Sequence, residues 1–290
     1  MAQIYSPLEI VISDDCSTDG TVAVIQEVLA AYSGDHRVIF NVNERNLGIG
    51  GHVSKVLLEL SNGDYFVLVG GDDISSVKHI STAVQRIREA PKGVLMVDFS
   101  ARTIDEFGRE DPSRKTIGSF DRISGTQLYR LEDYLLMERE IATFAPGRII
   151  SRELLNIFGS LSKDCPTEDT VFGLRALLAG GVLRTTDVLI KYRKHSAGVS
   201  FGENLNSIPL RGVFEQYKED IRVALGRDLI DATTECQLQK RLFVEKCLRD
   251  SKVNYSVGSA LYYLNRIFAE LVALVYKRIP ALIRYEKKRD

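Results

Sequence analysis

The chain has 290 residues, of which 44% are hydrophobic and 27% are charged, a composition typical of ordinary globular proteins. Its formal net charge of −1 gives no overall field that attracts nucleic acid, so we expect no nucleic-acid partner. The four cysteines form no CxxC pair, which argues against a zinc site or a disulfide scaffold and favours a reducing, cytoplasmic compartment.

Along the chain, β-branched runs that end in polar turns alternate with segments of helical periodicity. Strands are expected at 8–12, 37–40, 65–69, 94–99 and 188–192. Helices are expected from a cap at Ser17 or Thr18 to about Tyr32, then at 50–61, 77–89, 152–158, 168–179 and from about 207 onward. This alternation predicts an α/β fold with a mostly parallel sheet flanked by helices, over residues 1–205, and a helical extension over 206–290.

Two of the early strands end in paired aspartates, Asp14-Asp15 and Asp72-Asp73. Ligands of open parallel sheets bind beyond the carboxyl ends of the strands, so both pairs are expected near one crevice. Adjacent carboxylates repel each other, and a hard cation such as Mg²⁺ or Mn²⁺ removes that cost, which makes Asp72-Asp73 a candidate metal site. The alternative is a solvated turn in which an aspartate caps a helix that starts near Ser75.

Two further acidic stretches suit binding and catalysis. A carboxylate of Asp14-Asp15 can accept a hydrogen bond from a base N–H such as uracil N3, although helix capping explains the same residues. The run Pro166-Thr167-Glu168-Asp169 opens a helix, where the dipole favours ionised carboxylates. Such a carboxylate can take a proton from a sugar hydroxyl as a general base, or it can only complement the dipole.

Basic and glycine-rich segments complete the set of candidate residues. Arg193 and His195 follow a strand, where cations and an imidazole suit a diphosphate or a metal. The run Arg45-Asn46-Leu47-Gly48-Ile49-Gly50-Gly51 precedes a helix, but Val53 stands where a GxGxxG fingerprint needs glycine. No GxxxxGK[ST] loop occurs either, so the Rossmann dehydrogenase and P-loop interpretations are excluded.

The order and spacing of these motifs resemble those of family 2 glycosyltransferases. The run 9–21, EIVISDDCSTDGT, resembles the nucleotide-binding motif of that family. The family's order continues through Arg45-Asn46-Leu47-Gly48, Gly63-Asp64-Tyr65 and Gly71-Asp72-Asp73. Glu168-Asp169 resembles the catalytic-base motif, and Tyr192-Arg193 with His195 resembles the late motif. The resemblance covers roughly residues 4 to 200.

This resemblance implies a GT-A fold and an inverting transfer of a hexose or N-acetylhexosamine from a nucleotide-diphosphate sugar, such as a UDP-sugar. The implied acceptor is a glycan or a lipid-linked sugar in cell-surface polysaccharide synthesis. The resemblance further implies that Asp72 and Asp73 bind Mn²⁺ or Mg²⁺, and that Asp169 is the catalytic base with Glu168 beside it. The residues that it implies for binding the nucleotide and its diphosphate are Asp14, Asp15, Arg45, Gly48, Asp72, Arg193 and His195.

The chain departs from the family pattern in two places. The metal motif of the family usually reads Asp-x-Asp, but its first position here is Gly70. The family normally opens with a strand, a polar turn and a helix, about 30 residues on the scale of a βαβ unit, and residues 3–7 resemble the end of that helix. We therefore expect a truncated start that exposes strand edges and apolar helix faces, with impaired stability and activity.

The C-terminal stretch 255–290 combines apolar residues at helical spacing with a basic tail. It predicts either a peripheral contact with an anionic membrane surface or a helix packed on the first domain. Two other functions remain open at this point. A nucleotidyltransferase would also use a metal and carboxylates, and an inactive remnant would only bind nucleotide or a partner enzyme.

Overall fold

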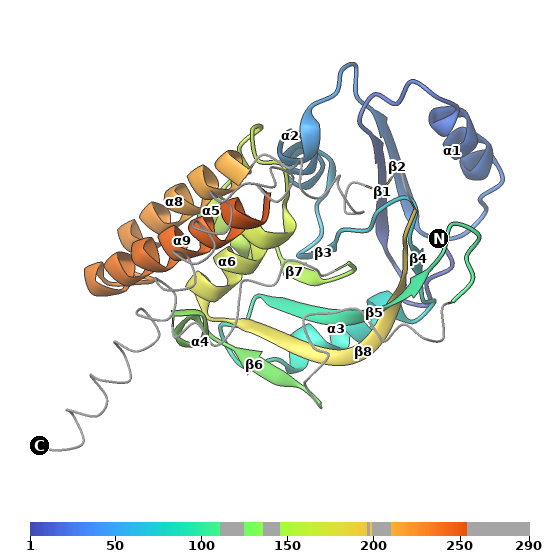
Figure 1. Ribbon diagram of the computed structural model, residues 1–290. Coiled ribbons are helices and arrows are strands. Elements are labelled where there is room, and N and C mark those ends of the chain that lie inside the picture. The colour runs from blue at the N-terminus through green and yellow to red at the C-terminus, as the bar shows by residue number, and fades with distance from the viewer. Residues whose placement is uncertain (111–124, 136–145, 196–197, 199–209, 254–290) are drawn as a thin grey trace, which may run out of the picture.

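A computed structural model describes residues 1–110, 125–135, 146–195, 198 and 210–253 (Figure 1). The strands are β1 (Glu9–Asp14), β2 (Arg37–Val42), β3 (Tyr65–Val67), β4 (Ile74–Ser75), β5 (Met96–Ile104), β6 (Gln127–Tyr129), β7 (Ile149–Ser151) and β8 (Val182–Arg193). The helices are α1 (Thr21–Ala30), α2 (Gly48–Lys55) with its π-helical continuation (Val56–Leu60), α3 (His79–Glu89), α4 (Leu131–Leu135), α5 (Glu153–Phe158), α6 (Asp169–Ala179), α8 (Leu210–Gly226) and α9 (Ala232–Val253).

The larger sheet has the strand order β3–β7–β5–β8–β4, and β6 pairs with β8 outside this path. β5 and β8 run parallel from the pair Met96 and Val182 to the pair Ile104 and Arg193, with register shifts between Asp98 and Ala101. The other pairs in this sheet are antiparallel. The sheet is therefore mixed, and its longest ladder brings the end of β8 beside the end of β5.

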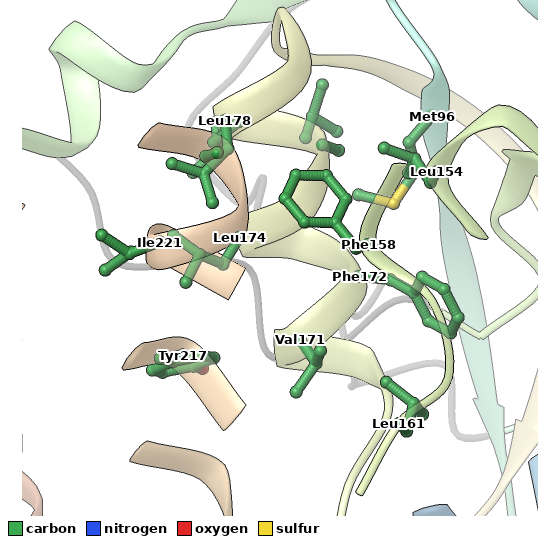
Figure 2. Packing of buried hydrophobic residues seen from close by; sticks show 14 of the residues in the cluster. Met96, Leu154, Phe158, Leu161, Val171, Phe172, Leu174, Leu178, Tyr217 and Ile221 are labelled. Atoms are coloured by element: carbon green, nitrogen blue, oxygen red, sulfur yellow. The ribbon is translucent and has the colours of Figure 1, made fainter. Parts of the chain in front are cut away.

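Apolar side chains on the two faces of this sheet form two cores. Neighbouring residues of a strand point to opposite faces, and Met96 and Val97 of β5 accordingly belong to different clusters. Val97 packs with Ala83, Val84 and Ile87 of α3. Met96 packs toward α5 and α6, where Figure 2 shows it beside Leu154. Helices thus cover the sheet on both faces.

The described helices of the predicted C-terminal extension share the core of α6. Tyr217 and Ile221 of α8 are fully buried, and Figure 2 shows them facing Val171 and Leu174 of α6. Residues 255–290, for which a membrane contact was predicted, lie outside the described residues. Within the described part of the chain, no helix combines the length and the apolar character needed to cross a membrane.

β1 and β2 form a separate parallel sheet, paired from Glu9 with Arg37 to Asp14 with Val42. Figure 1 shows this pair of strands and α1 apart from the larger sheet. Asp14 is the only fully buried residue of β1, β2 and α1, and none of their apolar residues belongs to either core. The apolar residues of this N-terminal part are therefore only partly shielded from water.

The predicted cap of α1 by Ser17 or Thr18 is wrong. The helix starts at Thr21 with Gly20 at its N-cap position, and no side chain caps it there. Ser17 instead donates two hydrogen bonds to Asp14, and Asp19 accepts the backbone N–H of Thr21 at 2.9 Å. The carboxylate that precedes Ser17 therefore takes the hydroxyl that the cap would need.

Candidate active site

Asp14 holds the turn at the end of β1. Its carboxylate accepts the backbone N–H of Ser17 at 2.8 Å and the Ser17 hydroxyl at 2.5 Å. These hydrogen bonds, the hydroxyl first, lower the pKa of the Asp14 carboxyl below its ordinary value. Asp14 is also buried, so its visible role is to fix the backbone from which the next residue, Asp15, projects.

Asp15 fastens the glycine-rich loop to β1. Its Oδ1 accepts the Asn43 side-chain amide at 2.8 Å and the Leu47 backbone N–H at 2.9 Å, and its Oδ2 accepts the Gly48 N–H at 3.0 Å. The Asp15 side chain therefore makes no capping hydrogen bond to α1. An ionised carboxylate has about four acceptor positions, so this count leaves one on Oδ2 for a ligand. Arg45, the other predicted residue of this loop, is exposed.

The turn after β3 carries the second acidic pair. The backbone N–H of Asp73 donates to the Gly70 carbonyl at 3.3 Å and closes the turn. β4 follows directly at Ile74 and α3 begins only at His79, so the alternative in which an aspartate caps the next helix is excluded. The Asp72 side chain is 46% exposed, and its Oδ2 lies 3.0 Å from Nε2 of His195.

Arg193 joins this turn to the end of β8. Its backbone N–H donates to Oδ1 of Asp73 at 3.0 Å, and its guanidinium donates to the Asp72 carbonyl at 2.8 Å. The same guanidinium donates to the carbonyls of Asp105 and Glu106, which follow β5. The structure therefore brings together four residues that the sequence placed in separate motifs, namely Asp72, Asp73, Arg193 and His195.

Electrostatics and sterics at this turn suit a bound cation. Burial, followed by repulsion from Asp72, raises the pKa of Asp73 to about 6, and a divalent cation would offset both costs. A Cβ at Gly70 would lie 2.7 Å from Oδ1 of Asp72, so a side chain there would require the exposed Asp72 carboxylate to move. No group of three or more His, Cys, Asp or Glu side chains is arranged to hold a metal among the described residues, so a cation here would need further oxygen ligands such as a diphosphate.

Glu168 and Asp169 lie at the start of α6, as predicted, and both are half-buried. Burial, followed by the charge of Asp169, raises the pKa of Glu168 to about 7. Burial also raises the pKa of Asp169. The charge of one carboxylate disfavours ionisation of its neighbour, so the pair takes up a proton more readily than separate carboxyls would. Such a pair has the proton affinity that a general base needs.

Backbone contacts link the loop held by Asp15 to the segment before Glu168. The N–H of Gly50, at the start of α2, donates to the Cys165 carbonyl at 3.1 Å. The Asp72 turn is connected instead to β8 through Arg193. No hydrogen bond between the described residues joins Asp15, Asp72 and Asp169 directly, so their convergence on one ligand stays a prediction.

Sequence reasoning missed several charged residues around this site. Asp98 and Arg148 are 0% and 2% exposed, and His79 is fully buried. The only signal for Asp98 was its position inside the apolar run 94–99, where a charge is costly without a partner. Nothing local marked Arg148, because its contacts are with residues far away in the chain.

The model of the family described as Glycosyl transferase family 2 matches residues 1–156. The chain belongs to this family. Among curated relatives of this chain, "Putative glycosyltransferase EpsE" of Bacillus subtilis is 29% identical over 108 residues, 37% of each chain. "Uncharacterized protein Rv1520" of Mycobacterium tuberculosis is 26% identical over 195 residues, 67% of this chain and 52% of that protein. The chain thus spans about half, or less, of these relatives.

Solved structures confirm the predicted GT-A fold of this chain. S. aureus TarS has a TM-score of 0.56 at 16% identity, over 96% of this chain and 50% of the TarS chain. The mannosyltransferase PcManGT from Pyrobaculum calidifontis, solved with GDP-Man and Mn²⁺, has a TM-score of 0.53 at 15% identity, over 97% and 80% of the two chains. At these identities the likeness shows the fold alone.

Proposed function

We propose that this glycosyltransferase moves a hexose or N-acetylhexosamine from a nucleotide-diphosphate sugar, a UDP-sugar in the first instance, to a glycan or lipid-linked acceptor, with inversion, in cell-surface polysaccharide synthesis. One observation carries the proposal. The bond between the Arg193 backbone and Asp73 joins residues 120 positions apart, and it collects two carboxylates, a guanidinium and an imidazole at one turn. That set of groups suits a metal-bound diphosphate.

The nucleotide base would bind next to Asp15. The acceptor position left on Oδ2 of Asp15 can receive the N3–H of uracil, and it could also receive the N1–H of guanine. The loop that Asp15 holds, with exposed Arg45 and Gly48, borders this position. PcManGT was solved with GDP-Man, so a guanine nucleotide is the comparison that a binding test must include.

Asp72 and Asp73 would hold Mn²⁺ or Mg²⁺ together with oxygens of the diphosphate, with His195 beside Asp72. When bound, such a cation neutralises the charge that develops on the leaving diphosphate. Arg193 already donates to backbone carbonyls on both sides of the turn. Its contribution is therefore to fix the shape of the turn and to add positive charge near the diphosphate.

Asp169 would act as the general base, with Glu168 sharing its proton. In the transfer, the acceptor oxygen forms a bond to the anomeric carbon while the bond from that carbon to the diphosphate breaks. The proton of the acceptor hydroxyl passes to the Asp169 carboxylate. A base on the acceptor side and a leaving group on the opposite side give inversion in a single displacement. The raised pKa values of the pair suit proton uptake near neutral pH.

The binding half of the proposal is tested by calorimetric titration with UDP, GDP, ADP and CDP, each with and without Mn²⁺. We expect one diphosphate to bind in a Mn²⁺-dependent manner, and Asp72→Asn to abolish the dependence on Mn²⁺. Asp19→Asn is the matched control, because Asp19 belongs to the same motif as Asp15 but is exposed and holds only the N–H of Thr21. Failure of every nucleotide to bind would refute the donor site.

The catalytic half is tested by release of nucleoside diphosphate from the matching sugar donor, with Asp169→Asn against Asp19→Asn. General-base catalysis contributes about 10²- to 10⁴-fold, so a loss of that size is expected for Asp169→Asn. Nucleotide binding without turnover would identify an inactive remnant. Release of pyrophosphate from a nucleoside triphosphate, without diphosphate release from the sugar donor, would identify a nucleotidyltransferase.

A further inference from the structure

A cluster of buried charges lies beneath the start of α6. Asp98 on β5 is 0% exposed, and Arg148 before β7 and Arg184 on β8 are each 2% exposed. Nε of Arg148 is 3.1 Å from Oδ1 of Asp98, and Nε of Arg184 is 3.9 Å from Oδ2. The Arg184 guanidinium also lies 4.3 Å from the centre of the Tyr129 ring. Burying three charges costs free energy, so their arrangement calls for a reason beyond stability.

Arg148 contacts the backbone of Asp169 as well as the carboxylate of Asp98. Its Nη1 donates to the backbone carbonyl of Asp169 at 2.5 Å. Its Nε and both oxygens of Asp98 lack a hydrogen bond of standard geometry among the described residues. A buried ion pair built for stability looks different: Arg175 donates to both oxygens of Asp220, at 2.8 and 2.9 Å. Arg148 is thus shared between the Asp98 carboxylate and the first residue of α6.

Two hydrogen-bond contacts of His79 connect the backbone beside Arg148 to the strand that follows the Asp72–Asp73 turn. Nε2 of His79 lies 2.7 Å from the carbonyl oxygen of Gly147, and Nδ1 of His79 lies 3.2 Å from the hydroxyl of Ser75. Ser75 belongs to β4, directly after that turn. The His79 ring is fully buried and packs edge-on against Phe99. Arg148 is therefore held between the candidate metal turn and the start of α6.

We propose that Arg148 is a positioning residue for glycosyl transfer, which holds the start of α6 through the Asp169 carbonyl and places a positive charge beside the Asp169 carboxylate, while Asp98 opposes that charge. The inference rests on the proposed role of Asp169 as the base. The charged and titratable groups that face the pair are Arg148, Asp98 and the Cys165 thiol. Arg148 lowers the pKa of Glu168 and of Asp169, and Asp98 raises that of Asp169. Removing Arg148 should therefore raise the pKa of Asp169, and removing Asp98 should lower it.

The first experiment measures titration without any substrate. The carboxyl ¹³C signals of Glu168 and Asp169, assigned by comparison with Glu168→Gln and Asp169→Asn, are followed against pH. Arg148→Met should raise the pKa of both groups, and Asp98→Asn should lower that of Asp169. Arg241→Met is the matched control, because Arg241 is also 2% exposed but lies on α9 and contacts Tyr134. It should leave both titrations unchanged.

Two further variants keep the test decisive if Arg148→Met does not fold. Arg148→Lys retains a cation, so the pair should titrate close to the wild type. Arg148→Met/Asp98→Leu removes both charges together and leaves Arg184 with its contact to the Tyr129 ring. The influence of Arg148 on Asp169 exceeds that of Asp98, so the pKa of Asp169 should still rise in the double variant. Unchanged titration in Arg148→Met or the double variant, or shifts of the same sign in Arg148→Met and Asp98→Asn, would overturn the inference.

The second experiment follows kcat against pH with the sugar donor identified by titration. For Arg148→Met, kcat should fall about tenfold or more below neutral pH and recover in alkaline buffer, where Asp169 ionises without help. KM for the donor should stay within about twofold, since Arg148 acts on the base and not on the nucleotide. Equal loss at every pH would indicate a purely structural role and overturn the inference. Full activity of Asp169→Asn would overturn this inference and the proposed base together, whereas unchanged titration overturns only the role of Arg148.

Discussion

The ion pair between Arg175 and Asp220 attaches α8 to α6, and its removal should be among the most damaging single changes in the described chain. Both side chains are 0% exposed, and Arg175 also donates to the carbonyls of Gly159 and Ser160. Asp220→Ala leaves a buried guanidinium without its counter-charge, which costs about 3–5 kcal/mol. A domain is stable by only about 5–15 kcal/mol, so the variant should lose much of its stability.

Removing both charges should cost less than removing one. Arg175→Met/Asp220→Leu gives up two bonds to backbone carbonyls and the bond from the Gln216 side-chain amide to Asp220, at about 1 kcal/mol each, but leaves no unpaired charge. Urea unfolding followed by circular dichroism gives the free energies. The matched control is Glu215→Ala, since Glu215 pairs with Lys218 on α8 but is 59% exposed and should contribute less than about 1 kcal/mol. A double variant as unstable as Asp220→Ala, or a control that costs as much, would refute the reasoning.

Three more predictions concern the carboxyl pair, one glycine and the N-terminal sheet. Folded Glu168 keeps its proton up to about pH 7, whereas the unfolded chain releases it near 4.5, so stability should fall as pH rises through this window. Urea unfolding at several pH values gives the unfolding free energy, and its fall across this window should be smaller by about 1–3 kcal/mol in Glu168→Gln. Gly147→Ala should cost more than about 2 kcal/mol in thermal unfolding, because φ is +75° and the new Cβ would lie 2.6 Å from the His79 ring. Gly159→Ala, at φ +74° with open space, should cost only the backbone strain, about 1–2 kcal/mol, and equal costs would contradict the clash. Backbone amides of β1 and β2 should exchange hydrogen faster than those of β5, and slower exchange would show that the smaller sheet is better protected than its burial indicates.

Local patterns predicted the elements that carry the candidate site. The apolar run before Asp14 became β1, and α6 begins at Asp169, because proline and two carboxylates precede an apolar helical stretch. The order of the family motifs was enough to anticipate that the Asp72 turn and Arg193 belong to one site. The two elements are each encoded within a short, continuous stretch of sequence, whereas the proximity of the Asp72 turn and Arg193 followed from the resemblance to the family.

Features that depend on distant partners could not be predicted in this way. β8 starts at Val182, six residues before the predicted strand at 188, because Arg184 interrupts the apolar pattern and is nevertheless buried against Tyr129. β7 was not predicted at all, and its antiparallel pairing with β3 gives the sheet its mixed character. The contact between Arg148 and Asp169 likewise needs the folded sheet to bring β5, β7 and β8 together.

Each of the two acidic sites keeps a partly buried carboxyl whose negative charge the fold does not fully compensate. Burial raises the pKa of Asp73 and of Glu168, so each carboxyl is less stable as an anion than it would be in water. Selection for stability alone would have replaced such groups or paired them fully, as Arg175 and Asp220 are paired. A diphosphate-bound cation would relieve the first strain, and a proton from the acceptor would relieve the second. His79 and Arg148 link these two places, so the proposed donor site and the proposed base share one buried polar path.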